Sequence, residues 1–484
     1  MRCGTRSCLW CIYRSATDSK FMKIDTTLKP EDLKAKLARF WEVSGAKIEL
    51  IEREYDAGKG SPVFTYDGKY TTRGWTEWTQ GFQYGGAILQ YDATGDARFL
   101  EIGRKGTLER MAPHVTHTGV HDHGFNNVST YGNLLRLMGE GRIAENPWER
   151  EFYRLALKLS GAVQASRWTA TADGLGFIHS FNGPHSLFAD TMRSLRVLAL
   201  GYRLGHVLMG EQDQKISLLL RLLQHAEATA RYNVYFGKGR DSYDVRGRVV
   251  HESIFNVHNG VYRCPSTQQG YTPFSTWTRG LSWVLSGYAE QLEFLSTVAS
   301  PEIEAVGLPD LPTREAVIAR FLEAATAGAD FFIENTPIDG VPYWDTGAPG
   351  LARMPDYLDR PADPYNDYEP VDSSAAAICA QGYLRLGRYL SEHGDRKAGS
   401  HYFQTGLTIA RTLLAEPYLS TDPAHEGMLL HSIYHRPNGW DHVPRGRRIA
   451  GGESCMWGDY HLMELAVYLQ RLASGAAYLR FFAV

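Results

Sequence analysis

The sequence predicts an all-α fold, an (α/α)6 toroid in which six helical hairpins close into a ring. Two observations lead to this prediction. Apolar residues recur with helical periodicity in twelve segments. Long loops rich in aromatic residues, glycine and proline separate several of these segments. Paired helices wrapped into a ring, with the loops building a cleft at one end, account for both. An open helical solenoid is the main alternative, but the chain shows no fixed sequence period.

The first predicted helix covers residues 30–53. Pro30 occupies its first turn, and Glu31 and Asp32 lie near the positive end of the helix dipole. Capping residues mark two later starts, at Thr313 and Ser373. The other predicted helices are 80–94, 97–111, 126–138, 147–166, 187–204, 212–231, 276–296, 313–334, 373–392, 398–415 and 459–472.

Three connecting segments are unusually long, namely residues 232–275, 335–372 and 418–458. Long segments without regular structure inside a compact domain are usually functional. We therefore expect functional residues to lie in and beside these loops. A few short strands are expected within the loops, for instance at residues 248–255.

No stretch of linker composition divides the chain, so residues 22–484 are predicted to form one domain. Residues 1–21 contain four arginine or lysine residues but no continuous apolar core, and they are predicted to be a disordered tail, not a signal peptide. Cys8 and Cys11 have the spacing of a metal or redox pair, but no second pair or nearby histidine completes a zinc set. Without an export signal, the expected compartment is the reducing cytoplasm.

The composition excludes several classes of protein. A net charge of −3 over 484 residues gives no basic surface for nucleic acid. No apolar run approaches the ~18 residues of a membrane span. The 11 Trp, 27 Tyr and 20 Phe residues offer faces that can stack on sugar rings. A large core also uses many aromatic residues, and composition alone favours that simpler interpretation.

The most informative stretch is His121-Asp122-His123-Gly124-Phe125, which places a carboxylate between two imidazoles at the mouth of a predicted helix. Asp122 is therefore a candidate acid, base or ligand, and equally a candidate helix N-cap. Four histidines lie within ten residues here, but their spacing does not match the helical HExxH pattern, so a metal site is not favoured. They are His114, His117, His121 and His123.

Asp190 is predicted to lie early in an apolar helix, 187–204. Burial there would raise its pKa and suit a general acid, whereas the helix dipole would act in the opposite direction. His251 lies in a strand-like run before a glutamine-containing loop. A lone histidine of this kind is more often structural than catalytic.

Residues 263–283 combine polar and aromatic side chains. Gln269 can donate and accept hydrogen bonds, and Gly270 lets the backbone approach a ligand. Arg279 offers a planar fork for a carboxylate, or it pairs with an internal acid. Stacking faces in this segment and before it, for which a core role stays open, are Tyr271, Trp277, Trp283 and Trp78.

Together these blocks resemble the unsaturated glucuronyl hydrolases, glycoside hydrolase family 88, over about residues 78–472. His121-Asp122-x-Gly124-Phe125 resembles the first aspartate motif of that family, and Asp190 resembles its second aspartate. Gln269-Gly270-Tyr271, followed by residues 275–283, resembles its substrate loop, and His251 lies at a position similar to its active-site histidine. Further matches are residues 341–345, 372–376, 427–431 and 456–460.

This resemblance implies an (α/α)6 barrel that hydrolyses oligosaccharides with a 4,5-unsaturated uronic acid at the non-reducing end. The family hydrates the C4=C5 enol ether without displacing the anomeric group directly, and it needs no metal or organic cofactor. Asp190 is implied to be the acid/base, and Asp122 to orient substrate and water and raise the pKa of Asp190. Substrate contacts are expected from His123, His251, Gln269, Gly270, Tyr271, Arg279, Trp78, Trp277 and Trp283. The expected partner is the oligosaccharide, bound by a monomer or homodimer.

The chain departs from the family pattern where substrate is selected. Thr272-Pro273-Phe274 replaces residues that are often acidic, Gln83 replaces an aromatic residue, and residues 168–184 look inserted. Two other enzymatic activities therefore stay open, a β-glucuronidase acting on saturated glucuronides and an unsaturated rhamnogalacturonyl hydrolase. A carbohydrate-binding protein without catalysis is the non-enzyme alternative, although the presence of both aspartates argues against it.

Overall fold

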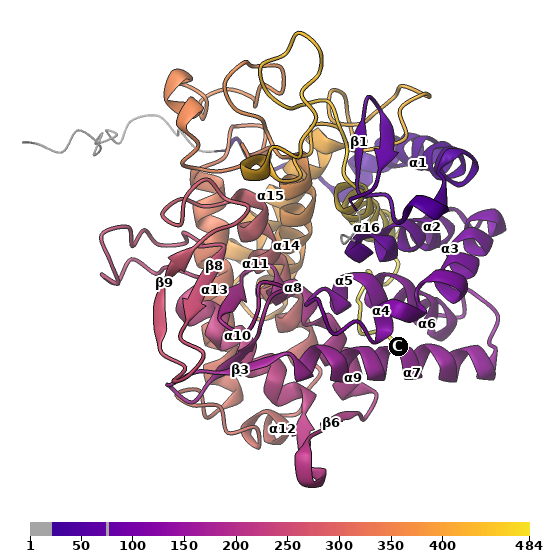
Figure 1. The fold of residues 1–484 in the computed structure, drawn as a ribbon. Helices are drawn as coiled ribbons and strands as arrows, with labels where there is room; N and C mark the ends of the chain where they lie inside the picture. The colour runs from indigo at the N-terminus through magenta and orange to yellow at the C-terminus, as the bar shows by residue number, and fades with distance from the viewer. Residues whose placement is uncertain (1–21, 74–76) are drawn as a thin grey trace, which may run out of the picture.

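The computed structural model describes residues 22–73 and 77–484 (Figure 1). The predicted tail at residues 1–21, with Cys8 and Cys11, lies outside the described residues. Among the residues that are described, no helix is both long and apolar enough to cross a membrane. Several long loops, coloured orange to yellow, gather at the upper end of the molecule in Figure 1.

The described helices form two concentric sets. In the inner set each element packs on the next, and the last packs back on the first, so the ring closes. A π-helical turn, Val128–Gly132, joins α5 to α6. The inner elements are α2 (Gln80–Thr94), α5 (His123–Asn127) with α6 (Asn133–Gly139), α8 (Thr191–Ser194) with α9 (Arg196–Arg203), α11 (Thr278–Leu295), α14 (Ser373–Glu392) and α16 (Met456–Ala473).

The outer set packs against the inner ring and completes the helical hairpins, which confirms the predicted (α/α)6 architecture. Its members are α1 (Lys34–Glu54), α3 (Ala97–Arg110), α7 (Pro147–Ser166), α10 (Leu218–Tyr232), α13 (Arg314–Glu334) and α15 (Arg396–Leu413). Two short helices, α4 (Ala112–Val115) and α12 (Ser300–Glu304), lie in connections between them.

Burial explains why these helices take different positions. Every residue of α11 is buried, as expected for a helix that is surrounded by others. In the outer helix α7 the buried residues recur at helical spacing, while Trp148 and Leu155 on its other face are exposed. An amphipathic helix of this kind can cover the ring with one face and meet solvent with the other.

Two predicted helices begin too early. Residues 187–204 were predicted as one helix, but Ser186–Phe188 forms strand β5, and helical structure starts at Thr191. Residues 212–231 likewise include strand β7 (Lys215–Ser217), and α10 starts only at Leu218, after Ser217 caps it. Short apolar runs do not distinguish a buried strand from a helix by periodicity, which explains the first error. In the second, residues 212–217 are polar except for Ile216 and precede the helix that Ser217 caps.

The strands are short and lie in the loops, as predicted. Three antiparallel pairs are β1 (Phe64–Tyr66) with β2 (Lys69–Thr71), β3 (Trp168–Ala170) with β4 (Gly176–Ile178), and β6 (Val207–Met209) with β7. The fourth sheet has the order β5–β8–β9, where β8 is Glu252–Phe255 and β9 is Tyr262–Ser266. The pairing of β5 with β8 continues at its end, where the amide of Ala189 donates to the carbonyl of His251 at 2.9 Å. Ala189 and His251 therefore lie side by side.

Buried ion pairs connect three elements of the inner ring, namely α8 with α9, α11 and α16. Arg193 of α8 lies 2.9 Å from Glu290 of α11 and 2.6 Å from Glu464 of α16. Arg196 of α9 lies 3.2 Å from the same Glu464. Because unpaired charges would be very costly in this interior, the pairs restrict how the inner helices can be placed relative to one another.

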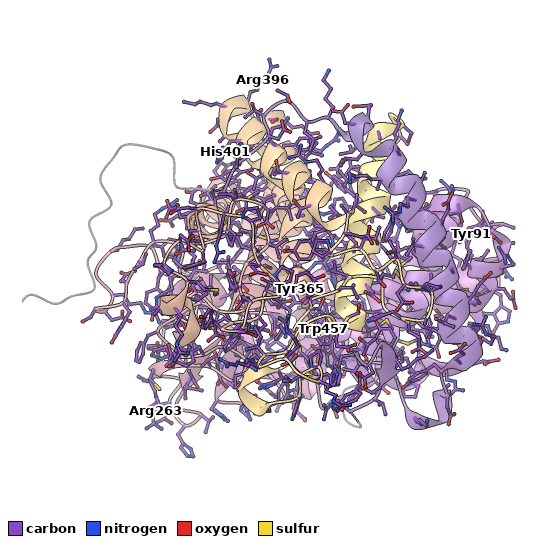
Figure 2. All side chains as sticks on the ribbon, turned by 90° about the horizontal axis from the view of Figure 1, so that it is seen from above. Tyr91, Arg263, Tyr365, Arg396, His401 and Trp457 are labelled. Atoms are coloured by element: carbon purple, nitrogen blue, oxygen red, sulfur yellow. The ribbon has the colours of Figure 1, made fainter. Side chains whose placement is uncertain are left out.

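The view from above shows that the start of α16 lies near the middle of the molecule. Trp457 is close to the centre of Figure 2, whereas Tyr91, Arg263 and Arg396 lie towards its edges. Trp457 is fully buried and stacks on Trp78, with 5.1 Å between the ring centroids. The N-terminal ends of α2 and α16 therefore meet at this central position.

We predict that Gly124→Ala destabilises the protein. A Cβ atom on Gly124 would lie 1.9 Å from the carbonyl oxygen of Ser194, so the contact between α5 and α8 would have to open. Chemical denaturation should show a loss of roughly 3 kcal/mol in the free energy of unfolding. Gly139→Ala is the control, because its Cβ would meet only one atom, at 4.0 Å. Equal effects of the two substitutions would contradict this account of the Gly124 contact.

Candidate active site

A cleft of about 760 Å³ lies where the inner helices begin. Trp78 precedes α2, Asp122 precedes α5, Asp190 precedes α8 and Trp277 precedes α11. Helix N-termini carry partial positive charge, so their convergence favours an anionic ligand. The lining residues are Trp78, Val120, His121, Asp122, Phe125, Phe181, Asp190, Gln268, Gln269, Trp277, Arg279, Trp283, Tyr434, His435, Asn438 and Trp440.

One imidazole lies between the two candidate catalytic carboxyl groups. The Nε2 atom of His121 is 3.3 Å from Oδ1 of Asp190 and 3.7 Å from Oδ1 of Asp122. Asp122 and Asp190 are each 8% exposed, and both line the cleft. Neither side chain caps its helix, which leaves the carboxyl oxygens available to the cleft. Asp122 thus occupies the predicted N-cap position of α5, but its side chain makes no cap hydrogen bond.

The environment shifts the pKa values of the two carboxyl groups in opposite directions. Burial raises the pKa of Asp122, and the charge of Asp190 raises it further, against the opposing effect of His121. Burial also acts to raise the pKa of Asp190, but the hydrogen bond and charge of His121 outweigh it, and the net shift is downward. The prediction that Asp190 has the raised pKa is thus wrong, because Asp190 lies ahead of its helix beside an imidazole and not within an apolar helix.

His121 completes this group as a protonated residue. Burial lowers the pKa of His121, but the charge of Asp122 and the hydrogen bond and charge of Asp190 raise it more. The net shift is upward from the ordinary value of 6.5. Phe181 stacks on the imidazole at 6.0 Å between centroids, and Phe188 meets it edge-on at 5.5 Å. The His121 imidazole, which these apolar rings partly enclose, is therefore placed to exchange a proton with the two carboxyl groups.

His251 supports the glutamine loop from behind the cleft. Its Nδ1 atom accepts hydrogen bonds from the amides of Gln268 at 3.1 Å and Gln269 at 3.4 Å. Burial lowers its pKa to about 4, so the ring is neutral and can accept these bonds. His251 is not among the described lining residues of the cleft. His251 thus positions the glutamine loop, and its expected contact with substrate stays a prediction.

Arg279 lies in the cleft wall with its charge already matched. Its guanidinium forms a buried ion pair with Asp372 at 2.9 Å and donates to Gln269 Oε1 at 3.0 Å. It also donates to the carbonyls of Ile433 and Tyr434. Of the two roles left open by the sequence, pairing with an internal acid is the one observed. The bond to Gln269 orients that amide, whose nitrogen remains able to donate to a ligand.

Three other predicted contact residues lie outside the cleft lining. His123 is buried, its Nδ1 2.9 Å from the hydroxyl of Ser160 and its Nε2 2.8 Å from the carbonyl of His117. The amide of Gly270 donates to Thr267 at 2.9 Å, and that of Tyr271 donates to Asp345 at 2.8 Å. His123 therefore holds the start of α5, and the two loop residues fix the turn that presents Gln269. The substrate contacts expected from these three residues stay predictions, and Trp78, Trp277 and Trp283 line the cleft.

The sequence analysis missed the wall formed by residues 434–440. His435, Asn438 and Trp440 line the cleft from this segment, which lies in the long loop 418–458. Asp441 anchors the segment by accepting hydrogen bonds from the amides of Tyr434 and His435. The length of the loop was the only signal of its function. Phe181 was missed in the same way, within the segment 168–184 that looks inserted.

The chain is similar to known proteins over most of its length. No family model matches the chain. The chain is 26% identical over 423 residues to the unsaturated glucuronyl hydrolase of Bacillus sp. (strain GL1), which covers 85% of this chain and 91% of that protein. It is 23% identical to an unsaturated chondroitin disaccharide hydrolase of Streptococcus agalactiae, over 83% of this chain and 84% of that protein.

Solved structures show the same fold. The crystal structure of the Bacillus enzyme, described as responsible for the degradation of glycosaminoglycan, matches with a TM-score of 0.66 at 23% identity, over 91% of this chain and 99% of that one. A UGL variant with dGlcA-Glc-Rha-Glc matches with a TM-score of 0.68 at 22% identity, over 93% and 99% of the two chains.

The closed ring of helical hairpins, with two carboxyl groups in an aromatic cleft at one end, defines an (α/α)6 barrel of the glycoside hydrolase type. Within that class, the chain is similar over most of its length to the unsaturated glucuronyl hydrolases, glycoside hydrolase family 88. The resemblance drawn from the aspartate motifs and the glutamine loop is thereby confirmed.

We predict that Arg279→Lys destabilises the protein, because a single ammonium group cannot replace the planar fork that reaches Asp372, Gln269 and two carbonyls. Chemical denaturation should show a loss of roughly 2 kcal/mol. Arg246→Lys is the matched control, since the pair that Arg246 forms with Asp330 is substantially exposed and should contribute little. A stable Arg279→Lys variant would show that the fork is dispensable.

Proposed function

We propose that this protein hydrolyses oligosaccharides that carry a 4,5-unsaturated uronic acid at the non-reducing end. The observation that carries the proposal is the group of Asp122, His121 and Asp190 in the cleft. Two further observations support it. Relatives that match most of the chain are named for this activity. The cleft walls offer aromatic faces beside amide donors.

The substrate is an enol ether, so its chemistry starts at carbon. A carboxyl group donates a proton to C4, and positive charge develops on C5 and the ring oxygen. Water adds to C5 and gives its second proton to the carboxylate that has just donated. The resulting hemiketal opens, with a carbonyl at C5 and the ring oxygen protonated. C1 is then a hemiacetal, which expels the rest of the sugar as an alcohol and becomes an aldehyde.

Asp190 is the acid/base in this proposal, and His121 supplies its proton. The pKa of Asp190 is lowered and that of His121 is raised, with 3.3 Å between Oδ1 and Nε2, so His121 is favoured over Asp190 as the group that holds the proton. The uronate carboxylate brings a further negative charge into the cleft, which raises the pKa of nearby carboxyl groups. The proton then moves from His121 to Asp190, from which it is donated to C4. Asp122, whose pKa burial raises, donates a hydrogen bond to substrate or water.

The uronate carboxylate is bound by hydrogen-bond donors and helix N-termini in this proposal. Arg279 is the only arginine or lysine among the described residues that line the cleft, and Asp372 already matches its charge. The remaining polar groups at the walls include Gln268, Gln269 and Asn438. The indole rings of Trp78 and Trp283 provide flat faces for the sugar rings.

We predict that Asp190→Asn lowers kcat by roughly a thousandfold, because it removes the group that exchanges protons with C4 and water. The measurement is the loss of ultraviolet absorbance of lyase-generated disaccharides, which reports the C4=C5 bond. Asp122→Asn should lower kcat less. Asp96→Asn, a capping residue of the outer helix α3, should leave it unchanged.

The same assay separates the alternative functions. Near-normal turnover by Asp190→Asn would contradict the assignment of Asp190. If the wild-type protein cleaves a saturated aryl glucuronide and leaves the absorbance of the unsaturated disaccharide unchanged, it is a β-glucuronidase. Preference for unsaturated rhamnogalacturonan disaccharides would identify the third activity. Binding of the disaccharide without cleavage would identify a carbohydrate-binding protein.

We predict that kcat/KM falls as the pH rises through the raised pKa of His121, above 6.5. His121 is protonated below this pKa and has lost its proton above it, so activity is lost on the alkaline side. In His121→Gln, Asp190 must hold the proton itself, and the alkaline limb should move down by about one pH unit or more. If the alkaline limb of the pH profile stays in place in this variant, His121 is excluded as the residue that supplies the proton to Asp190.

A further inference from the structure

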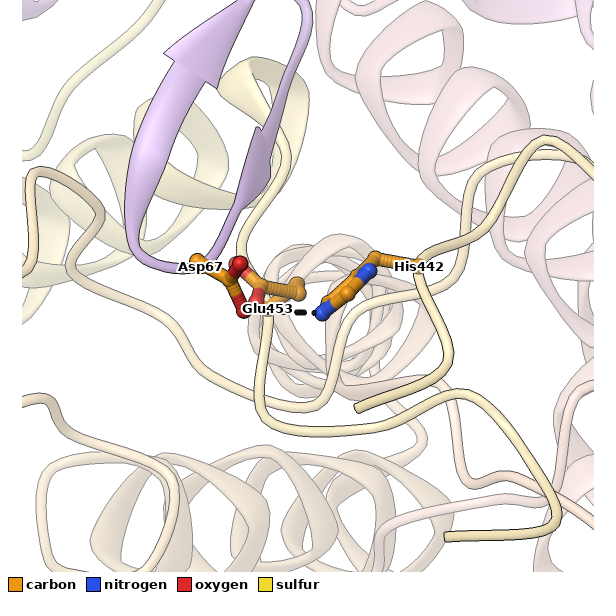
Figure 3. A group of neighbouring side chains, drawn as sticks. All are labelled: Asp67, His442 and Glu453. Atoms are coloured by element: carbon orange, nitrogen blue, oxygen red, sulfur yellow. Dashed lines mark hydrogen bonds and ion pairs between the residues drawn. The ribbon is translucent and has the colours of Figure 1, made fainter. Parts of the chain in front are cut away.

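Three side chains of the kinds that bind metal ions converge beside the loop that walls the cleft (Figure 3). Asp67 lies in the turn between β1 and β2, and His442 and Glu453 lie in the long loop before α16. One ligand atom from each lies within 4.8 Å of the other two. Nε2 of His442 is 3.0 Å from Oδ1 of Asp67. Within the part of the chain that is described, this is the one such group.

The surrounding residues hold two of these side chains in place. Glu453 accepts hydrogen bonds from the hydroxyl of Thr65 and, at 3.3 Å, from the amide of Gly68. His425 lies 3.7 Å away from the same carboxylate oxygen. The ring of Tyr66 lies against the His442 ring, with 3.9 Å between centroids.

The group is also open to an ion. His442 and Glu453 line a small cavity of about 230 Å³ between the β1 strand and the long loop. The side chain of Asp67 is 76% exposed, so an ion can enter from solvent. The site is thus partly buried on the protein side, where its charges are least screened, and accessible on the other.

We propose that Asp67, His442 and Glu453 bind a divalent transition metal ion, with Zn²⁺ as the best-fitting ion. One imidazole nitrogen and two carboxylate oxygens are common zinc ligands, and three protein ligands leave a position for water. Ca²⁺ and Mg²⁺ prefer ligand sets made entirely of oxygen. Nε2 of His442, which faces Asp67, would hold the ion, and the neutral ring would keep its single proton on Nδ1.

The ion would clamp the cleft wall. His442 follows Asp441, which anchors Tyr434 and His435, and it lies two residues from Trp440. Binding at His442 therefore ties the wall segment 434–440 to the β1–β2 hairpin. Where the proposed hydrolysis holds, Zn²⁺ should lower KM with little change in kcat, because no member of the metal group lines the cleft among the described residues. Binding itself is tested without any reference to that activity.

The experiment is calorimetric titration of the chelator-treated full chain with zinc chloride. Cys8→Ser and Cys11→Ser are introduced first, so that these thiols do not compete for zinc. The expected result is one Zn²⁺ per chain and a higher midpoint of thermal unfolding.

Asp67→Asn should weaken Zn²⁺ binding at least tenfold. Asparagine tolerates the positive φ of 47° at this exposed position, so the metal-free variant should unfold at the same temperature as the parent. Asp213→Asn is the matched control, since Asp213 is also exposed and has a φ of 58°. It should bind Zn²⁺ as the parent does. His442→Gln is the second test and should also lose binding.

Two results would overturn the proposal. The first is the absence of a 1:1 Zn²⁺ complex in the parent protein. The second is unchanged affinity in both Asp67→Asn and His442→Gln, which would place the ion on other residues. Failure of the unsaturated-uronide assay would leave these results intact, so the proposed metal site and the proposed hydrolysis stand or fall separately.

Discussion

The geometry of the candidate site depends on one imidazole that lies between two buried carboxyl groups. His121 can reach both Asp122 and Asp190 only because the inner helices begin at the same end of the ring. Two carboxylates in a buried cleft would repel each other and be poorly solvated. The proton on His121 offsets that cost for Asp190, and burial keeps Asp122 closer to neutral. The ring of helices and the chemistry of the cleft are therefore consequences of one arrangement.

The residues around this group mainly set its position. His251 and Arg279 act on the glutamine loop from behind and from the side, and both are themselves fixed by buried partners. The opposite wall is anchored by Asp441, and the long loop that carries it is joined to the β1–β2 hairpin by backbone hydrogen bonds at Glu426 and Ser454. A preorganised wall of this kind lowers the ordering cost of binding a flexible oligosaccharide.

Much of the fold followed from local patterns, because the inner and outer helices differ in how their apolar residues repeat. The two aspartates and the aromatic positions Trp78, Trp277 and Trp283 also followed, since each lies near the N-terminal end of a predicted helix. What could not be predicted depended on long-range contacts. The pKa direction of Asp190 is set by a histidine 69 positions away in the chain. The side chains of His435, Asn438 and Trp440 reach the cleft through a loop path that carries no periodic signal.

The central claim is that the carboxyl pair delivers a proton to carbon. The most direct measurement follows the products of a lyase-generated disaccharide in D₂O by proton NMR at early times. The account predicts one deuterium at C4 of the released uronic acid, placed on a single face, because Asp190 donates from one side of the ring. A released sugar that retains its C4=C5 double bond, or deuterium distributed over both faces of C4 from the start, would contradict it.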